Sequence, residues 1–314
     1  MNNTGCKNPK QKNKDLLSKI QKYKNEIQNC ATIVKTLTSE IIELKNNNNC
    51  LTGHRSKSPI QINVSKTERN FNLICLFSHY LHYTCNVKDL RIINENSKIE
   101  NIIGTHINLQ SDSNVTRLKI ENSNMFYLPI NIFKKFQNLV AIQFKNTNLE
   151  HLFKGNFIGA SKLKELIING NKIKSLDDNI FEGTQGLESI NLNSNKIEKL
   201  SPNTFERLEN LKHLLMMNNL IEELHVQLFK DLVKLEHLDV SSNQLKSLDG
   251  KLLIFNTKLA KIYFNKNKIQ VIGGDILNYS KKINVFDFYG NVCISKVNNF
   301  DDFVSKIIQN CRKR

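Results

Sequence analysis

The chain has 314 residues, 39% of them hydrophobic, which is enough to bury a sizeable core. Lys and Arg number 45 against 29 Asp and Glu, so the formal net charge is +16. No apolar run approaches the ~20 residues that a membrane-spanning helix needs, and the opening residues lack the apolar stretch of a signal peptide. The lysines are dispersed along the chain, which favours a generally basic surface over one that binds nucleic acid.

The first 70 residues are predicted to contain one regular element. We expect residues 1–12 to form a disordered basic tail and the polar residues 46–70 to form a flexible linker. Between them, residues 13–45 carry a heptad pattern, which favours a parallel two-stranded coiled coil and hence a homodimer. The alternative is a single amphipathic helix packed on the rest of the chain. The a positions are Ile20, Ile27, Val34 and Ile41, and the d positions are Leu16, Tyr23, Cys30, Leu37 and Leu44.

Residues 71–114 are expected to form an N-terminal cap. They contain Cys75 and Cys85, and Val87, Leu90 and Ile92 have the spacing of a repeat strand. The regular pattern that follows begins 28 residues after Val87, so this segment is an irregular lead-in.

A 24-residue pattern then fills residues 115–290, with apolar positions in the order L-x-x-L-x-L-x-x-N-x-L-x-x-L. Its units begin at Val115, Leu139, Leu163, Leu187, Leu211, Leu235, Leu259 and Ile283. This period and spacing predict a leucine-rich-repeat solenoid, an α/β-type horseshoe with a parallel concave β-sheet. One strand per repeat cannot bury its apolar face alone, so successive repeats must stack.

Two columns of residues are expected to hold the repeats together. An Asn recurs at the ninth position, where its amide can satisfy buried backbone groups as the chain leaves the strand. The first two units carry Ser123 and Thr147 there instead, which predicts a looser N-terminal end. A Phe column is expected to form a stacked spine. The Asn column is Asn171, Asn195, Asn219, Asn243, Asn267 and Asn291, and the Phe column is Phe133, Phe157, Phe181, Phe205 and Phe229.

The concave sheet is the candidate recognition surface. Its outward positions are more apolar and aromatic in the middle and later repeats than a scaffold requires, and such residues are enriched at protein interfaces. The alternative is that these apolar residues are scattered and have no binding role. The candidate residues are Ile167, His213, Leu215, Met217, His237, Asp239, Tyr263 and Tyr289.

Residues 291–314 are expected to form a C-terminal cap, in which a short helix after Asn299 covers the last repeat. Four cysteines bracket the repeats, which predicts the disulfides Cys75–Cys85 and Cys293–Cys311 and an oxidising, extracellular compartment. Four unrelated free thiols, and a cytoplasmic chain, are the alternative.

Three cysteines are left over, which suggests an intermolecular bond, with Cys30 at a coiled-coil d position as its candidate. Cys30 could instead act as a small apolar residue. The glycosylation sequons at Asn2, Asn63, Asn114 and Asn278 are compatible with a secreted glycoprotein.

No motif for catalysis or nucleotide binding is present, so we expect neither an enzyme nor a cofactor. His213 and His237 are 24 residues apart and share a face with Asp239, a set that could hold a metal. We favour ordinary surface histidines and predict no metal site.

In these features the chain resembles the secreted leucine-rich-repeat proteins of insects. The resemblance covers residues 71–311 and depends on the Cys75–Cys85 segment, Gly104-Thr-His106, the 24-residue repeats and Gly290-Asn291-Val292-Cys293. It implies an extracellular, non-enzymatic protein that binds other proteins. For some members it implies a role in innate immunity, through disulfide-linked complexes formed by coiled coils.

We therefore expect recognition of another protein through the concave sheet. One alternative is a scaffold that associates with itself through residues 13–45. The other is a basic-surface binder of anionic polysaccharide or nucleic acid, whose affinity would fall steeply with salt.

Overall fold

The computed structural model describes residues 70–79, 81–107, 109–276, 278–279, 282–293 and 311. The predicted tail and coiled coil with Cys30 therefore lie outside the described residues, as do the C-terminal helix and the sequons at Asn2 and Asn63. The predicted linker also lies outside them except for Asn70, which begins a strand and is not part of a linker. Within the described residues, no helix is long and apolar enough to cross a membrane.

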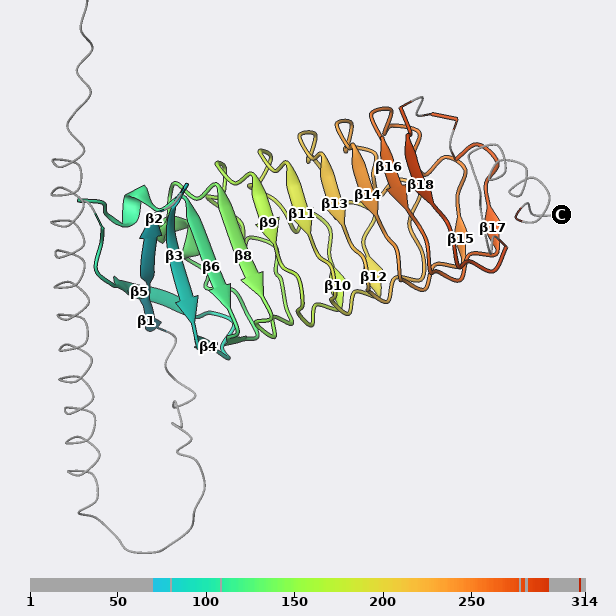
Figure 1. Ribbon diagram of the computed structural model, residues 1–314. Coiled ribbons are helices and arrows are strands. Elements are labelled where there is room, and N and C mark those ends of the chain that lie inside the picture. The colour runs from blue at the N-terminus through green and yellow to red at the C-terminus, as the bar shows by residue number, and fades with distance from the viewer. Residues whose placement is uncertain are drawn as a thin grey trace, which may run out of the picture. The chain divides into compact units, whose positions relative to one another are not determined.

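A ten-stranded sheet runs through the described part of the chain (Figure 1). All neighbours in it are parallel except β2 and β3, which form an antiparallel pair. Parallel neighbours in the repeats pair residues 24 apart, as in Ser189↔His213 and His213↔His237, so the predicted leucine-rich-repeat solenoid is confirmed. The strands are β2 (Leu76–His79), β3 (Tyr83–Lys88), β6 (Arg117–Glu121), β8 (Ala141–Lys145), β9 (Glu165–Ile167), β11 (Ser189–Asn191), β13 (His213–Leu215), β14 (His237–Asp239), β16 (Lys261–Tyr263) and β18 (Val285–Asp287).

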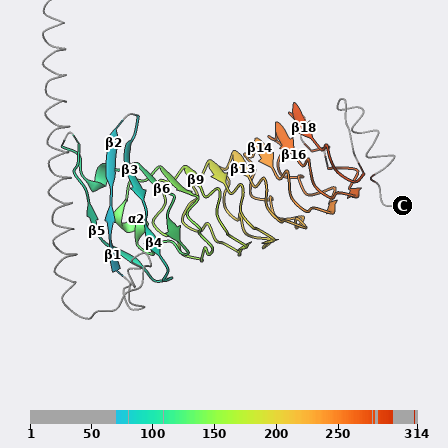
Figure 2. The same ribbon diagram turned by 60° about the horizontal axis from the view of Figure 1, so that its bottom comes forward.

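The core lies between this sheet and the return segments of the repeats, where successive turns stack (Figure 2). In each central strand the middle residue is buried and its two neighbours are not, which is the alternation that a half-buried strand requires. The Phe column is a continuous stack: ring centroids lie 5.6 Å apart for Phe157 and Phe181, and 5.8 Å apart for Phe181 and Phe205. The predicted spine is confirmed.

The Asn column joins each turn to its neighbours. Asn219 donates from Nδ2 to the backbone oxygens of Leu192 and Met216, at 3.1 and 3.0 Å, and its Oδ1 accepts from the Ile197 amide at 3.1 Å. Four other Asn residues of the column repeat these bonds at the same spacing, namely Asn195, Asn243, Asn267 and Asn291. Asn171 repeats the bonds to the turn before it, to the Phe144 carbonyl and from the Leu149 amide. Because these backbone groups are buried, the amides remove a desolvation cost that the turn would otherwise carry.

A column of left-handed residues precedes the Asn column and was not predicted. At the eighth position of every repeat the backbone dihedral φ is positive, for instance +55° at Ser194 and +55° at Lys266. The sequence signal was the recurrence of Asn and Gly, which tolerate this conformation best. The column is Asn122, Asn146, Gly170, Ser194, Asn218, Ser242, Lys266 and Gly290.

Disulfides close both ends of the described solenoid. Cys75 bonds to Cys85 across the β2–β3 pair, with Cα atoms 5.1 Å apart. Cys293 bonds to Cys311, with Cα atoms 5.3 Å apart, and Cys311 is fully buried. Both expected pairings are present within the ~7 Å limit for a bridge.

Short elements complete the cap and the side of the solenoid. Four parallel two-stranded sheets pair β1 (Asn70–Ile74) with β5 (Lys98–Ile103), β4 (Arg91–Ile92) with β7 (Asn124–Met125), β10 (Ser175–Leu176) with β12 (Lys199–Leu200), and β15 (Ser247–Leu248) with β17 (Val271–Ile272). A 3-10 helix η2 (Asp112–Asn114) leads into the first repeat, and the helical turn α2 (Ile132–Lys135) lies within it.

Candidate functional site

The sheet face is the outward side of the ten-stranded sheet, formed by the third, fifth and seventh residues of each repeat. From the third repeat onward its fifth position alternates between apolar or aromatic and polar residues. Ile167, Leu215 and Tyr263 are separated by Asn191 and Asp239, since each strand pairs with the next in register. The apolar residues of this column are therefore one polar strand apart, and they do not form one continuous patch.

The structure gathers most of the candidate residues on three adjacent strands. His213 and Leu215 lie on β13, with Met217 just after it. His237 and Asp239 lie on β14, and Asp239 is the direct partner of Leu215. A row of rings crosses the three strands, with centroids 6.1 Å apart for His213 and His237 and 5.4 Å apart for His237 and Tyr263. We call His213, Leu215, Met217, His237 and Tyr263 the central cluster.

Ile167 and Tyr289 lie outside the central cluster. Ile167 is on β9, two strands before β13, with Asn191 of β11 between it and Leu215. Tyr289 follows β18, one strand beyond Tyr263, and is 56% exposed. The two residues therefore flank the cluster on opposite sides.

The apolar and aromatic strand residues of the sheet face are only partly exposed. Ile167, Leu215 and Tyr263 are half-buried and not fully exposed, because neighbouring strands cover each of them on both sides. Met217 lies beyond the end of its strand and is 37% exposed. A charge at position 215 would therefore carry a desolvation cost, and position 217 is the better place to test the surface.

The polar residues of the fifth position are fixed by the backbone that follows them. Asp239 accepts hydrogen bonds from the Ser241 amide at 2.9 Å and from the Ser241 hydroxyl at 2.6 Å. Asn191 and Asp287 accept from the backbone amides two residues later in the same way, at 3.0 Å each. Asp239 is thus held in a turn motif that the sequence analysis did not identify.

His237 is the perturbed titratable group of this surface. Burial lowers its pKa below the ordinary 6.5, with smaller lowering by His213 and Lys261, while the Asp239 carboxylate acts in the opposite direction. Its Nε2 atom is buried and has no hydrogen-bond partner. No group of three or more potential ligands suited to a metal ion occurs among the residues that the structure describes.

A ladder of ion pairs borders the central cluster. Glu188 contacts Lys164 at 3.1 Å and Lys212 at 2.8 Å, each one turn away. The hydrogen bond from Lys212, and then that from Lys164, lowers the pKa of Glu188 to about 2. This ladder was not predicted, although charges that alternate in sign at 24-residue spacing were its signal in the sequence.

Comparison with known proteins identifies the repeats. Residues 161–221 match the family described as "Leucine rich repeat". Among solved structures, one described as "Crystal structure of TLR13-ssRNA13 complex" is 21% identical, with a TM-score of 0.48, and covers 58% of this chain. The likeness spans only 30% of that chain. No curated protein matches. The family match and the 24-residue strand register show that this chain folds as a leucine-rich-repeat solenoid.

Proposed function

We propose that this chain is a non-enzymatic recognition protein that binds another protein through its sheet face. The observation that carries the proposal is the central cluster, where Leu215 and Met217 lie beside a row of three rings. Aromatic residues and Met are enriched at protein interfaces, and a few such residues supply most of the binding energy.

The surroundings of the cluster support a protein ligand. The Lys164–Glu188–Lys212 ladder lies on one side of the central cluster. Asp239 lies within the cluster and Asp287 lies beyond it, and both accept hydrogen bonds from backbone amides. Apolar and aromatic side chains combined with fixed hydrogen-bonding groups are typical of a protein interface. The side chains also project from a hydrogen-bonded sheet, so little conformational entropy is lost when a partner binds.

The two disulfides support an extracellular setting. Disulfides persist in oxidising compartments, and here they lie at the two ends of the solenoid, where a stacked core would otherwise open to water. The resemblance to secreted leucine-rich-repeat proteins agrees with this setting, and we extend the proposal to recognition outside the cell.

Site-specific photo-crosslinking tests the proposal. A photoreactive amino acid replaces Met217 in one version of the full chain and Lys251, which is exposed on a return segment, in another. Each version is incubated with extracellular fluid of the source organism. We expect a discrete protein adduct at position 217 and none at position 251. Adducts of equal yield at both positions, or none at position 217, would overturn the proposal.

A competition arm separates binding from folding. Excess unlabelled chain should suppress the adduct, whereas chain with Met217→Asp should not. Val233→Asp is the matched control, because Val233 is 41% exposed and lies off the sheet face, and it should compete like the unchanged protein. Thermal unfolding of both variants should agree with that of the parent within about 2 °C.

A further inference from the structure

On one side of the solenoid, the backbone pairing between successive turns is interrupted at one repeat. The sheets β10–β12 and β15–β17 lie on this side, and the repeat between them contributes no strand. Glu198 and Lys199 donate their backbone amides to Lys174 of the turn before. In the part of the chain that the structure describes, no backbone hydrogen bond joins Glu222, Glu223 or Leu224 to the turn before them.

Two carboxylates lie side by side at the start of the break. Glu198 and Glu222 occupy the same position in adjacent turns, directly before the strand positions, where the intact sheets place Lys174 beside Glu198 and Lys246 beside Gln270. At the strand position itself, Lys199 and Glu223 are of opposite charge. Carboxylates placed directly opposite each other disfavour strand pairing. One edge of β12 and the amides of Glu222, Glu223 and Leu224 are consequently left open, while the Lys246 amide still donates to the Glu222 carbonyl at 3.3 Å on the side of β15.

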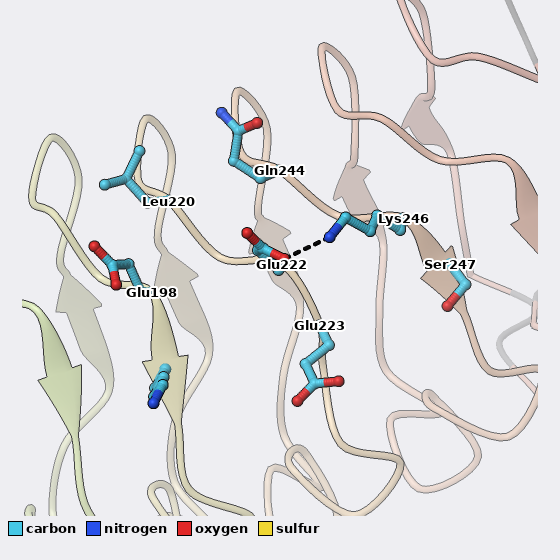
Figure 3. Close-up of a pocket in the computed structure, with 8 residues that line it drawn as sticks. Glu198, Leu220, Glu222, Glu223, Gln244, Lys246 and Ser247 are labelled. Carbon is cyan, nitrogen blue, oxygen red and sulfur yellow. Dashed lines mark hydrogen bonds and ion pairs between the residues drawn. The ribbon is translucent and has the colours of Figure 1, made fainter.

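A hollow of about 700 Å³ lies over this break, within the usual size range of ligand sites. Side chains from three successive turns surround it, including Glu198, Leu220, Glu222, Glu223 and Lys246 (Figure 3). A second hollow of about 620 Å³ continues from it and shares Glu198, Lys199 and Glu223, while adding Pro202 and Asp249. Together the two hollows form the side groove.

The charge of the side groove is opposite to that of the chain. Its lining holds the carboxylates Glu198, Glu222, Glu223 and Asp249 against the two amines Lys199 and Lys246, in a protein of net charge +16. Glu222 is already paired with Lys246 at 2.5 Å. Glu198 and Glu223 form no ion pair among the described residues, so they are available to a cationic partner.

We propose that the side groove binds an extended, lysine- or arginine-bearing peptide segment of a partner protein. The segment would lie along the break and pair its backbone with the open amides of Glu222 and Glu223, as a strand added to a sheet edge does. Its cationic side chains would pair with Glu198 and Glu223, and their aliphatic stems would pack on Leu220, which is 38% exposed. This site is separate from the sheet face.

Fluorescence anisotropy with the full chain tests the proposal. The probe is a labelled ten-residue peptide of alternating lysine and threonine. We expect saturable binding, which Glu198→Gln with Glu223→Gln weakens by about tenfold because two charge-assisted contacts are lost. The matched control, Glu100→Gln with Glu209→Gln, alters the net charge equally at exposed positions outside the groove and should stay within about twofold of the parent.

Two further arms define the site. A peptide methylated at every second backbone amide should bind several-fold more weakly, and equal binding would overturn strand pairing. Met217→Asp should leave peptide binding unchanged, since it alters only the sheet face. Equal weakening by the groove and control variants, or no saturable binding, would overturn the proposal that the side groove binds a peptide. Neither result would affect the proposed function of the sheet face.

Discussion

The cap with the first two repeats, and the repeats from residue 163 onward, satisfy the same buried backbone by different means. In the later repeats the strands are three residues long, and a buried Asn joins each turn to the one before. In the earlier part β6 and β8 pair over five residues, and Ser123 and Thr147 replace the amide. Longer strand pairing therefore accompanies the weaker hydrogen-bonding residues.

The difference shows that the buried backbone groups of a turn can be satisfied by the Asn column or by other residues. Ser123 still accepts the Leu90 amide at 3.1 Å, and the Thr147 hydroxyl donates to Asn171 at 2.9 Å. What every turn needs is a partner for its buried amides and carbonyls. The expectation of a looser N-terminal end remains a prediction, and the following changes test it.

The largest effect is expected from Asn219→Leu. This substitution removes the hydrogen-bond partner of the Ile197 amide and of the Leu192 and Met216 carbonyls. The free energy of unfolding should therefore fall by about 3–5 kcal/mol. Ser123→Ala is the counterpart in the earlier part and should cost about 1 kcal/mol, because mainly one amide loses its acceptor. Urea denaturation of both variants measures the difference, and similar losses would remove the contrast between the two regions.

The two terminal disulfides should differ less in their contributions to the free energy of unfolding than the Asn219 and Ser123 substitutions do. Cys293→Ser should cost about 2–5 kcal/mol, and Cys75→Ser about 0.5 kcal/mol less, because its loop spans 10 residues and not 18. The β2–β3 pairing also remains to hold the shorter loop. Thermal unfolding with and without reductant gives both values. A greater loss for Cys75→Ser would mean that the N-terminal cap limits the stability of the solenoid.

Extending the Asn column backward should give a small gain. In Thr147→Asn the new amide would lie 27 residues after the carbonyl of Ile120, the spacing that Asn219 has to Leu192. We expect about 1 kcal/mol of added stability, measured by urea denaturation. Ser189→Asn, on the sheet face, is the control for substitution by Asn alone. A loss of stability would show that the longer strands leave no room for the amide.

The smallest effect is a pH dependence carried by the later repeats. Because burial lowers the pKa of His237 below 6.5, the folded chain binds this proton less tightly than the unfolded chain. The stability that neutral His237 provides is complete above pH 6.5 and declines as the pH falls through and below that value. His237→Gln should therefore flatten the melting temperature between pH 7.5 and 5. The counterpart His82→Gln, at an exposed position in the cap, should not.

The repeat period made much of the fold predictable, because each position of the pattern recurs in several repeats. The register of β13 on β14, the Phe spine and the Asn bonds all follow from residues 24 apart. The left-handed residue at the eighth position was equally periodic. It was missed because Ser194 and Lys266 are not typical of that conformation.

The candidate sites were less predictable, because they depend on how far neighbouring turns cover a side chain. The sequence placed Leu215 on the outward face, but its half-burial follows from Asn191 and Asp239 on either side of it. The break behind the side groove depends on whether two short segments come within hydrogen-bonding distance. Glu198 and Glu222, 24 residues apart with equal charge, were its sequence signal.

The hydrogen bonds and strand pairs of the repeats join only neighbouring turns, and this short separation in sequence affects the rate of folding. Asn219 bonds to Leu192, 27 residues earlier, and His213 pairs with His237, 24 residues later. In a chain of 314 residues such a contact spans roughly 0.08 of the length, a value typical of fast-folding helical bundles. Parallel sheets usually form slowly because their strands are distant in sequence, whereas this one can grow by a turn at a time from any nucleus. Each turn can therefore be added during synthesis, soon after its own residues have left the ribosome.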